Sequence, residues 1–302
     1  MKDVWKENAK SKQLEYKHRL GLTASGTWGK DKIEYPHILE DEDAKNGANF
    51  YCYKDQEEWK RLQDWAKRSN GKKVNFLGAG MKNMLRSEHI PYNLFYPLEK
   101  FRKDNPQMLK QFLEELFKKQ NISIDKITQI KIEYVSGRSR KELLNDNTSF
   151  DAYIEYKKRN DTCGLGIEVK YTEKSYPYGA TEKKRMFDDD SEYNLLSKKS
   201  GYYREEKLHK LRSKILKQPW RNHLLGLKLL ELNEIQKFYS VHIYPEGNKY
   251  QAKVCDEYIN CLSDKGKNTF VPVTFERFVE VADKVFTKPE NKNWIDYLKR
   301  RY

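Results

Sequence analysis

Apolar residues recur along the chain with two different spacings, and each spacing predicts a different element. In 54–69 and 105–120 they recur three or four residues apart, which is typical of an amphipathic helix. Asn105 can cap the second of these helices, and Pro106 suits its first turn. Shorter segments of strand length follow at 127–135, 150–156, 165–171 and 237–244. The pattern therefore predicts a helix, three strands and, after an interval, a fourth strand.

The segments around these strands are predicted from helix breakers and charge. Residues 80–90 are expected to form a short helix that Pro91 kinks or stops. After the third strand, a charge-dense loop at 172–200 leads to a basic helical region at 202–232, which Pro219 divides into two helices. The ends of the chain are expected to form a basic helix or arm at 1–20, irregular structure at 21–50, and helices at 274–286 and 290–301.

This order of elements is typical of an α/β fold with a mixed central sheet flanked by helices. Residues 158–161 are polar and suit a hairpin turn, so the second and third strands are expected to pair antiparallel. No internal repeat and no shift in composition marks a second domain.

Charge and composition narrow the classes of partner. The 59 Lys and Arg against 45 Asp and Glu give a formal net charge of +14, which attracts polyanions. Mean hydropathy is low, at −0.99. However, 21 Tyr, 13 Phe and 6 Trp indicate a folded, aromatic-rich core, because disordered chains are poor in these residues. Nucleic acid is therefore a plausible partner.

Compartment is inferred from what the chain lacks. No run approaches the ~18 apolar residues of a membrane span. The N-terminal segment has no apolar stretch of the kind found in a signal peptide. Cys52, Cys163, Cys255 and Cys261 lack the spacing of a zinc site, and free thiols suit a reducing cytosol. We therefore expect a cytoplasmic protein with no membrane partner.

Charged residues on the second and third strands point to chemistry. Alternation places Glu168 and Lys170 on one face of their strand, and a paired hairpin would bring Asp151 beside Glu168. Two carboxylates that close are unfavourable without a cation. Carboxylate oxygens with open water positions suit Mg²⁺, and the main-chain carbonyl near Val169 can add a third protein oxygen. Such alternation also occurs on the solvated face of antiparallel sheets, so a structural role stays open.

This layout has a direct chemical use. A metal held there would bind a scissile phosphate and lower the pKa of an attacking water. Lys170 would orient or activate that water, or offset charge that develops on the phosphate.

Asp151, Glu168, Val169 and Lys170 on consecutive strands resemble the core motif of the PD-(D/E)XK nuclease superfamily, also called restriction-endonuclease-like. The predicted order of elements is similar to the α-β-β-β-α-β core of that superfamily. On this resemblance, the chain would comprise an N-terminal basic arm and helical wrap at 1–75, a nuclease core at 76–250, and a C-terminal helical extension packed on the core at 251–302.

The resemblance also implies further site residues. The segment 85–89 resembles the helix before the sheet in a bacterial branch of endonucleases, and it implies Glu88 as an additional acid at the metal site. Gln218 matches a Gln or Lys that superfamily members point at the site from the helix after the third strand. The residues expected to contact a nucleic acid, as a basic stripe or beside the site, are Arg204, Lys207, Lys214, Arg221 and Asn222.

The activity implied by the resemblance is that of an Mg²⁺-dependent endonuclease, with Mn²⁺ able to substitute, that hydrolyses phosphodiester bonds; DNA rather than RNA is the expected substrate. The expected products carry 5′-phosphate and 3′-hydroxyl ends. Restriction–modification, antiviral defence or repair is the expected setting, and a homodimer would supply the two active sites that cutting a duplex needs. Two alternatives stay open: a catalytically silent nucleic-acid-binding or assembly subunit on the same fold, and a basic protein that docks on acidic partners.

Overall fold

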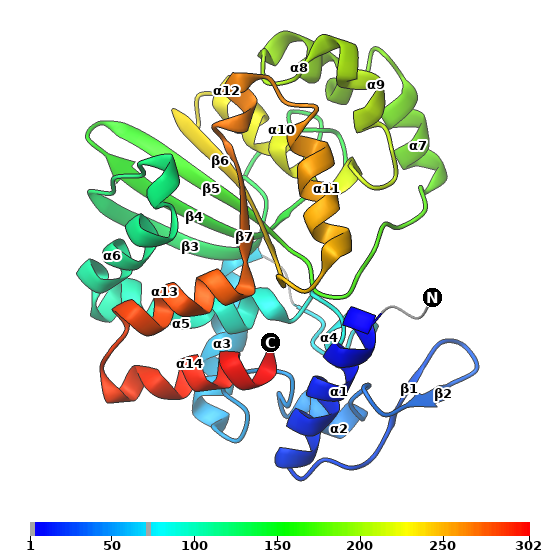
Figure 1. Cartoon of the computed structure of the whole chain (residues 1–302), viewed down its shortest axis with the longest axis vertical. Coiled ribbons are helices and arrows are strands. Elements are labelled where there is room, and N and C mark those ends of the chain that lie inside the picture. The colour runs from blue at the N-terminus through cyan, green and yellow to red at the C-terminus, as the bar shows by residue number, and fades with distance from the viewer. Residues whose placement is uncertain (1–3, 71–73) are drawn as a thin grey trace.

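Five strands form the central sheet, in the order β3–β4–β5–β6–β7 (Figure 1). The protein is described by a computed structural model covering residues 4–70 and 74–302. The pairs β3–β4 and β4–β5 are antiparallel, whereas β5–β6 and β6–β7 are parallel, so the predicted mixed sheet is confirmed. The strands are β3 (Lys126–Tyr134), β4 (Phe150–Lys158), β5 (Asp161–Val169), β6 (Lys237–Tyr244) and β7 (Phe270–Thr274).

The strand β7 was not predicted. Its five residues include Pro272, which has no N–H to donate and is therefore confined to an edge strand. The strand does lie at the edge of the sheet, where one side needs no partner.

Helices cover both faces of the sheet, each over its own apolar core (Figure 1). One core joins the inward side chains of the strands to α3 (Gln56–Asn70), α5 (Ile90–Asp104), α6 (Pro106–Leu116), α13 (Phe275–Val285) and α14 (Pro289–Arg301). The other core is built by α8 (Glu192–Ser200), α10 (Lys217–Glu231) and α11 (Lys249–Ile259). The predicted helices at 54–69, 105–120, 274–286 and 290–301 are confirmed, and Asn105 caps α6 by accepting from the Met108 N–H at 3.3 Å.

The predicted helix at 80–90 is wrong. Only α4 (Ala79–Lys82) is helical there, and Pro91 lies in the first turn of α5 rather than ending a helix. A proline fits a first turn because its missing N–H would have had no partner there. Pro97 lies inside α5 and leaves the Asn93 carbonyl without its helical donor. The Trp294 Nε1–H of α14 donates to that carbonyl at 2.9 Å, so the helix continues through the proline.

Other connecting segments hold more regular structure than predicted. The segment 172–200 contains α7 (Ala180–Phe187) as well as α8, where a loop was predicted. Pro219 lies in the first turn of α10 and does not divide it. The segment 21–50 contains a small hairpin and a helix. The remaining elements are α1 (Val4–Arg19), β1 (Gly26–Trp28), β2 (Ile33–Tyr35), α2 (Asp41–Lys45), η1 (Lys118–Gln120), η2 (Glu205–Lys207), α9 (Leu208–Leu211) and α12 (Asp264–Lys267).

The first and last helices lie side by side. Gln13 of α1 donates from Nε2 to the Arg301 carbonyl of α14 at 2.6 Å, and the rings of Tyr16 and Tyr297 meet edge to face at 5.7 Å. The C-terminal end of α14 therefore lies against α1 (Figure 1). All four cysteines are buried free thiols, as expected.

Candidate active site

Three carboxylates lie in a row across β3, β4 and β5. The register of β3 with β4 sets Glu133 opposite Asp151, and the register of β4 with β5 sets Asp151 opposite Glu168. The Val169 backbone N–H donates to Asp151 Oδ2 at 2.7 Å, which fixes that carboxylate against the end of β5. The antiparallel hairpin thus brings together the two acids that the sequence placed on neighbouring strands.

Lys170 follows directly after β5 and turns back onto the same row. Its ammonium forms an ion pair with Glu168 Oε1, and both side chains are buried, with 8% and 5% of Lys170 and Glu168 exposed. Asn222 of α10 donates from Nδ2 to the other oxygen of Glu168. The helix above the sheet therefore holds the Glu168 carboxylate in place from one side while Lys170 holds it from the other.

The pKa values of the three acids in this row are shifted in different directions. Burial raises the pKa of Asp151 well above its usual value, and the charge of Glu168 adds to the shift. Burial also raises the pKa of Glu133, with the charges of Glu168 and Glu88 acting in the same direction. For Glu168 burial is opposed by Lys170 and Asn222, which hold its pKa below the usual range. The row therefore contains one stabilised carboxylate beside two that resist ionisation.

The pKa of Lys170 shows the reverse balance. Burial alone would lower it, but the charges of Glu168, Asp151 and Glu173 outweigh burial and raise it above its usual value. Lys170 therefore keeps its proton around neutral pH and contributes a positive charge to the site.

Glu88 reaches the site from the turn before α5, not from a helix. Its carboxylate accepts from Arg86 Nη2 at 2.7 Å, and Arg86 Nε lies 3.6 Å from Glu173. A Cβ at Gly80 would lie 2.6 Å from the Glu88 carboxyl carbon, so the absence of a side chain there makes room for Glu88. Glu88 thus lies at the site as the ion-pair partner of Arg86.

The first two turns of α10 bring the remaining predicted residues. Gln218 and Asn222 line the same hollow as Asp151 and Lys170. Arg221 lines it too, but its guanidinium is already engaged: it donates to Glu182 Oε1 at 3.0 Å, Asp146 Oδ2 at 3.2 Å and Thr148 Oγ1 at 2.8 Å. Arg221 therefore braces the wall of the hollow and ties α7 to α10.

The hollow has a volume of about 240 Å³ and is mostly polar. It is lined by Arg86, Ser87, Glu88, Asn147, Thr148, Ser149, Asp151, Glu168, Lys170, Tyr176, Gln218, Arg221 and Asn222. Arg204 and Lys207 do not reach it. They line a separate hollow of about 570 Å³ together with Lys210, and Lys214 is exposed beyond both. The predicted basic stripe is therefore split between two places.

The donor set fits a hard divalent cation. Across residues 4–70 and 74–302, no three Asp, Glu, His or Cys side chains converge closely enough to enclose a metal by themselves. Asp151 and Glu168 nonetheless offer two carboxylates side by side, which matches the one or two that Mg²⁺ usually takes from a protein. A cation there would relieve the repulsion that raises the pKa of Asp151.

Glu133 was missed by the sequence reasoning. It lies on β3 with a left-handed backbone (φ 48°), and Ser149 Oγ donates to its Oε2 at 3.2 Å. The signal was present, because Glu133 is an acid near the end of a strand that pairs with β4. His242 of β6 was also missed; it lies beside Glu168 in the parallel register and bonds Gln251 Oε1 at 3.1 Å.

Comparison with known proteins agrees with this geometry. The model of a family described as the PD-(D/E)XK nuclease superfamily matches residues 2–302, so the chain belongs to this superfamily. Neither a curated protein nor a solved structure matches it. In the part of the chain that the structure describes, no helix has the length and apolar character needed to cross a membrane.

Proposed function

We propose that this member of the PD-(D/E)XK nuclease superfamily is a metal-dependent endonuclease, with Asp151, Glu168 and Lys170 as its catalytic residues. The observation that carries the proposal is the convergence of these three side chains in one polar hollow, at the end of the β4–β5 hairpin. This arrangement suits hydrolysis of a phosphodiester. The two carboxylates offer oxygen ligands to a metal ion, and the buried, protonated lysine offers a positive charge to the phosphate.

Each residue has a role that its contacts support. Asp151, Glu168 and the Val169 carbonyl would hold Mg²⁺ or Mn²⁺, with Glu88 as an additional acid. When bound, the metal supplies Lewis acidity for the phosphate and a more acidic water. Lys170 keeps its proton beside Glu168 and offsets negative charge that develops on the phosphate. Asn222 orients Glu168, and Gln218 contacts the phosphate or the attacking water from the first turn of α10.

We further propose DNA, rather than RNA, as the substrate, with 5′-phosphate and 3′-hydroxyl products. The net charge of +14 supports a polyanionic substrate. Restriction, phage defence or repair in the cytoplasm is the proposed setting, and pairing of two chains would supply the second active site needed to cut both strands. Arg204, Lys207 and Lys214 remain proposed backbone contacts, from the surface beyond the hollow.

The test is cleavage of plasmid DNA by the full chain in Mg²⁺ or Mn²⁺, with EDTA as the blank. We expect nicked and linear products from the wild type. Asp151→Asn, Glu168→Gln and Lys170→Met should each lower the rate by at least about 100-fold, the scale of losing a group that acts in the transition state. Asp190→Asn, an exposed acid, serves as the matched control. Cleavage that survives all three substitutions would overturn the assignment.

A second candidate function rests on one specific contact set. Both oxygens of Glu168 are already engaged, one by Lys170 and one by Asn222. A metal would therefore have to share Glu168 with these partners, and a chain that cannot do so would bind nucleic acid without cutting it. Salt-sensitive DNA binding with no cleavage in Mg²⁺, Mn²⁺ or Co²⁺ would favour this silent subunit over the nuclease.

A further inference from the structure

Two neighbouring hollows lie apart from the candidate active site, where α1, α5 and α14 meet the 51–54 turn. Their volumes are about 340 and 330 Å³, which is in the range of small-ligand pockets. Tyr51 lines both, and we call the two hollows together the tyrosine groove. Among the described residues, none lines both this groove and the hollow that holds Asp151.

The first hollow combines rings with positive charge. Four tyrosines and three cations line it, and no acidic side chain is among the described residues that do so. The rings brace one another: Tyr297 meets Tyr16 at 5.7 Å and Tyr51 at 5.4 Å, both edge to face. Such pairs hold ring orientations fixed, so the buried Tyr297 supports the half-buried rings of Tyr16 and Tyr51. The tyrosines are Tyr16, Tyr51, Tyr53 and Tyr297, and the cations are Arg19, Lys54 and Arg300.

Lys54 is held at the mouth of this hollow by a strained backbone. Its φ is 75°, in the left-handed region that costs a residue with a side chain on the order of 1 kcal/mol. Its Nζ lies 5.7 Å from the centre of the Tyr53 ring, so charge and ring are presented together.

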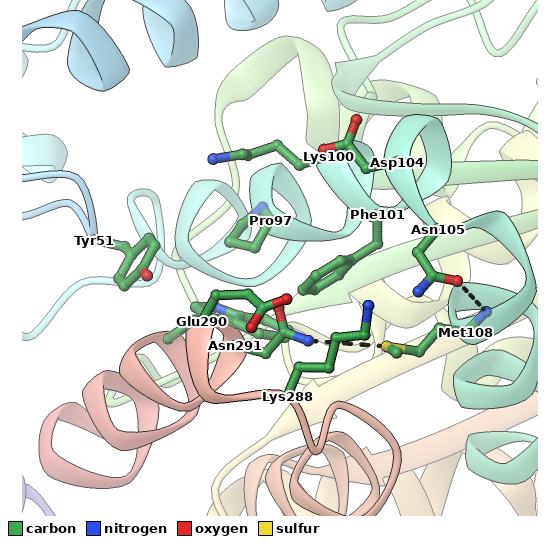
Figure 2. A pocket seen from close by; sticks show the side chains of 11 residues that line it. Tyr51, Pro97, Lys100, Phe101, Asp104, Asn105, Met108, Lys288, Glu290 and Asn291 are labelled. Atoms are coloured by element: carbon green, nitrogen blue, oxygen red, sulfur yellow. Dashed lines mark hydrogen bonds between the residues drawn. The ribbon is translucent and has the colours of Figure 1, made fainter.

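The second hollow is more apolar at its floor. Figure 2 shows Phe101 pointing into it from α5, with Pro97 beside it and Met108 across from it. The Phe101 ring stacks on Phe286 at 4.3 Å, which fixes its position. The rim carries charges of both signs and two amides, and Lys288 and Glu290 enter from the segment that begins α14 (Figure 2). A flat aromatic ring with polar edges fits an apolar floor and a polar rim of this kind.

We propose that the tyrosine groove binds a single-stranded segment of nucleic acid. This inference rests on the proposed function, since it assigns part of the substrate of the same enzyme to a second site. Lys54 and Arg300 bind backbone phosphates, whereas Arg19 is already paired with Glu15. The half-buried rings of Tyr16, Tyr51 and Tyr53 and the Phe101 hollow receive unpaired bases. Rings interleaved with cations suit single strands because every base has a π-face, whereas bases in a duplex are already stacked on one another.

The test measures binding in the full chain carrying Asp151→Asn, so that cleavage does not consume the probe. The probes are a fluorescently labelled oligothymidylate and a blunt duplex of matched length, followed by anisotropy over a range of salt. Tyr53→Ala should weaken oligothymidylate binding about 10-fold, the scale of removing one ring on which a base stacks, and Tyr53→Phe should retain it. Binding of the duplex should change by less than about 2-fold, because it does not use the groove.

Charge reversal tests whether the cations of the groove bind phosphates. The double variant Lys54→Glu, Arg300→Glu should reduce the slope of log affinity against log salt by at least about 1.4, because each phosphate that a cation neutralises on a single strand contributes about 0.7 to that slope. The matched control is Lys253→Glu, Lys284→Glu, which makes the same change in net charge at lysines that are 74% and 67% exposed elsewhere. Thermal melts confirm that each variant is folded. Equal effects of groove and control variants, or unchanged binding in Tyr53→Ala, would overturn the inference.

Failure of this inference and failure of the proposed function give different results. If the wild type cleaves plasmid while all groove variants bind oligothymidylate normally, the nuclease stands and the groove falls. If the groove variants lose single-strand binding but the wild type never cleaves in any metal, the groove stands and the nuclease falls.

Discussion

Asp151→Asn should make the metal-free protein more stable, although it removes a residue of the proposed active site. The Val169 N–H that donates to Asp151 can still donate to the asparagine oxygen, so the local geometry is kept. Burial and the charge of Glu168 raise the pKa of Asp151, so a carboxyl group at this position costs free energy at neutral pH whether it ionises or holds a proton, and the neutral amide of asparagine avoids that cost. Two like charges about 5 Å apart repel by about 3 kcal/mol at an effective dielectric constant of about 20.

The attraction of Lys170 for Asp151 offsets part of this repulsion, since its charge acts in the opposite direction. We therefore expect a net gain of about 1–2 kcal/mol in the free energy of unfolding, or about 1.5–3 °C in Tm for a chain of this size. Mg²⁺ or Mn²⁺ should reverse the order. A ligand at 100 times its Kd stabilises the protein that binds it by about 2.7 kcal/mol. The wild type should gain this stabilisation from the metal, and the Asp151→Asn variant should not.

Thermal melts of both proteins, in EDTA and in a metal titration, measure the four stabilities needed. Asp190→Asn controls for removal of an acid from an exposed position. The reasoning fails if Asp151→Asn is less stable than the wild type in EDTA, because the carboxylate would then be a favourable part of the metal-free fold. It also fails if both proteins gain the same stability from metal, because the metal would then bind elsewhere.

Three further substitutions test the fold around the site. Gly226→Ala should lower the free energy of unfolding by about 1–3 kcal/mol or more, because the new Cβ would lie 2.0 Å from the Phe238 ring. Urea unfolding measures this loss, and an unchanged midpoint would contradict the close packing of α10 on β6. Trp294→Phe should lower the free energy of unfolding by about 1–3 kcal/mol, because it leaves the Asn93 carbonyl of α5 without a donor. A loss below about 0.5 kcal/mol would mean that water replaces the indole as the donor. His223 is buried, and burial lowers its pKa to about 3. Its contribution to stability is therefore complete above pH 6.5 and is lost as pH falls toward 3, by about 2 kcal/mol at pH 5. Between about pH 7.5 and 5, the free energy of unfolding of His223→Gln should fall by correspondingly less than that of the wild type, as measured in urea melts. An identical fall in both proteins would refute the lowered pKa of His223.

Strands and most amphipathic helices could be predicted because their patterns are local. β6 begins and ends where alternation and Pro245 place it, and the β4–β5 hairpin follows from two apolar segments with a short polar turn. The same locality made Asp151, Glu168 and Lys170 predictable as neighbours. A hairpin turn of two residues leaves little freedom in register, so residues at the far ends of the two strands still meet across the hairpin.

Helix α5 could not be predicted in the same way. Two prolines within its length argue against a helix on local grounds, yet the donor that Pro97 lacks is replaced by Trp294, nearly 200 residues later. The segment 172–200 was similar: its charges suggest a loop until Lys217 and Arg221 of α10 pair with Glu182 of α7. In both cases a distant partner satisfies a group that the local sequence leaves unsatisfied.

Local patterning was enough to predict the mixed sheet, the hairpin and the acid–acid–lysine row, because each depends on alternation over a few residues and on one short turn. The rest of the site depends on contacts between distant segments. It set Glu133 opposite Asp151, brought Asn222 onto Glu168, engaged Arg221 with acids, and left Arg204 beside a different hollow. These contacts join segments whose separation along the chain carries no periodic signal. Strand pairing and the packing of helices on the sheet bring these segments together.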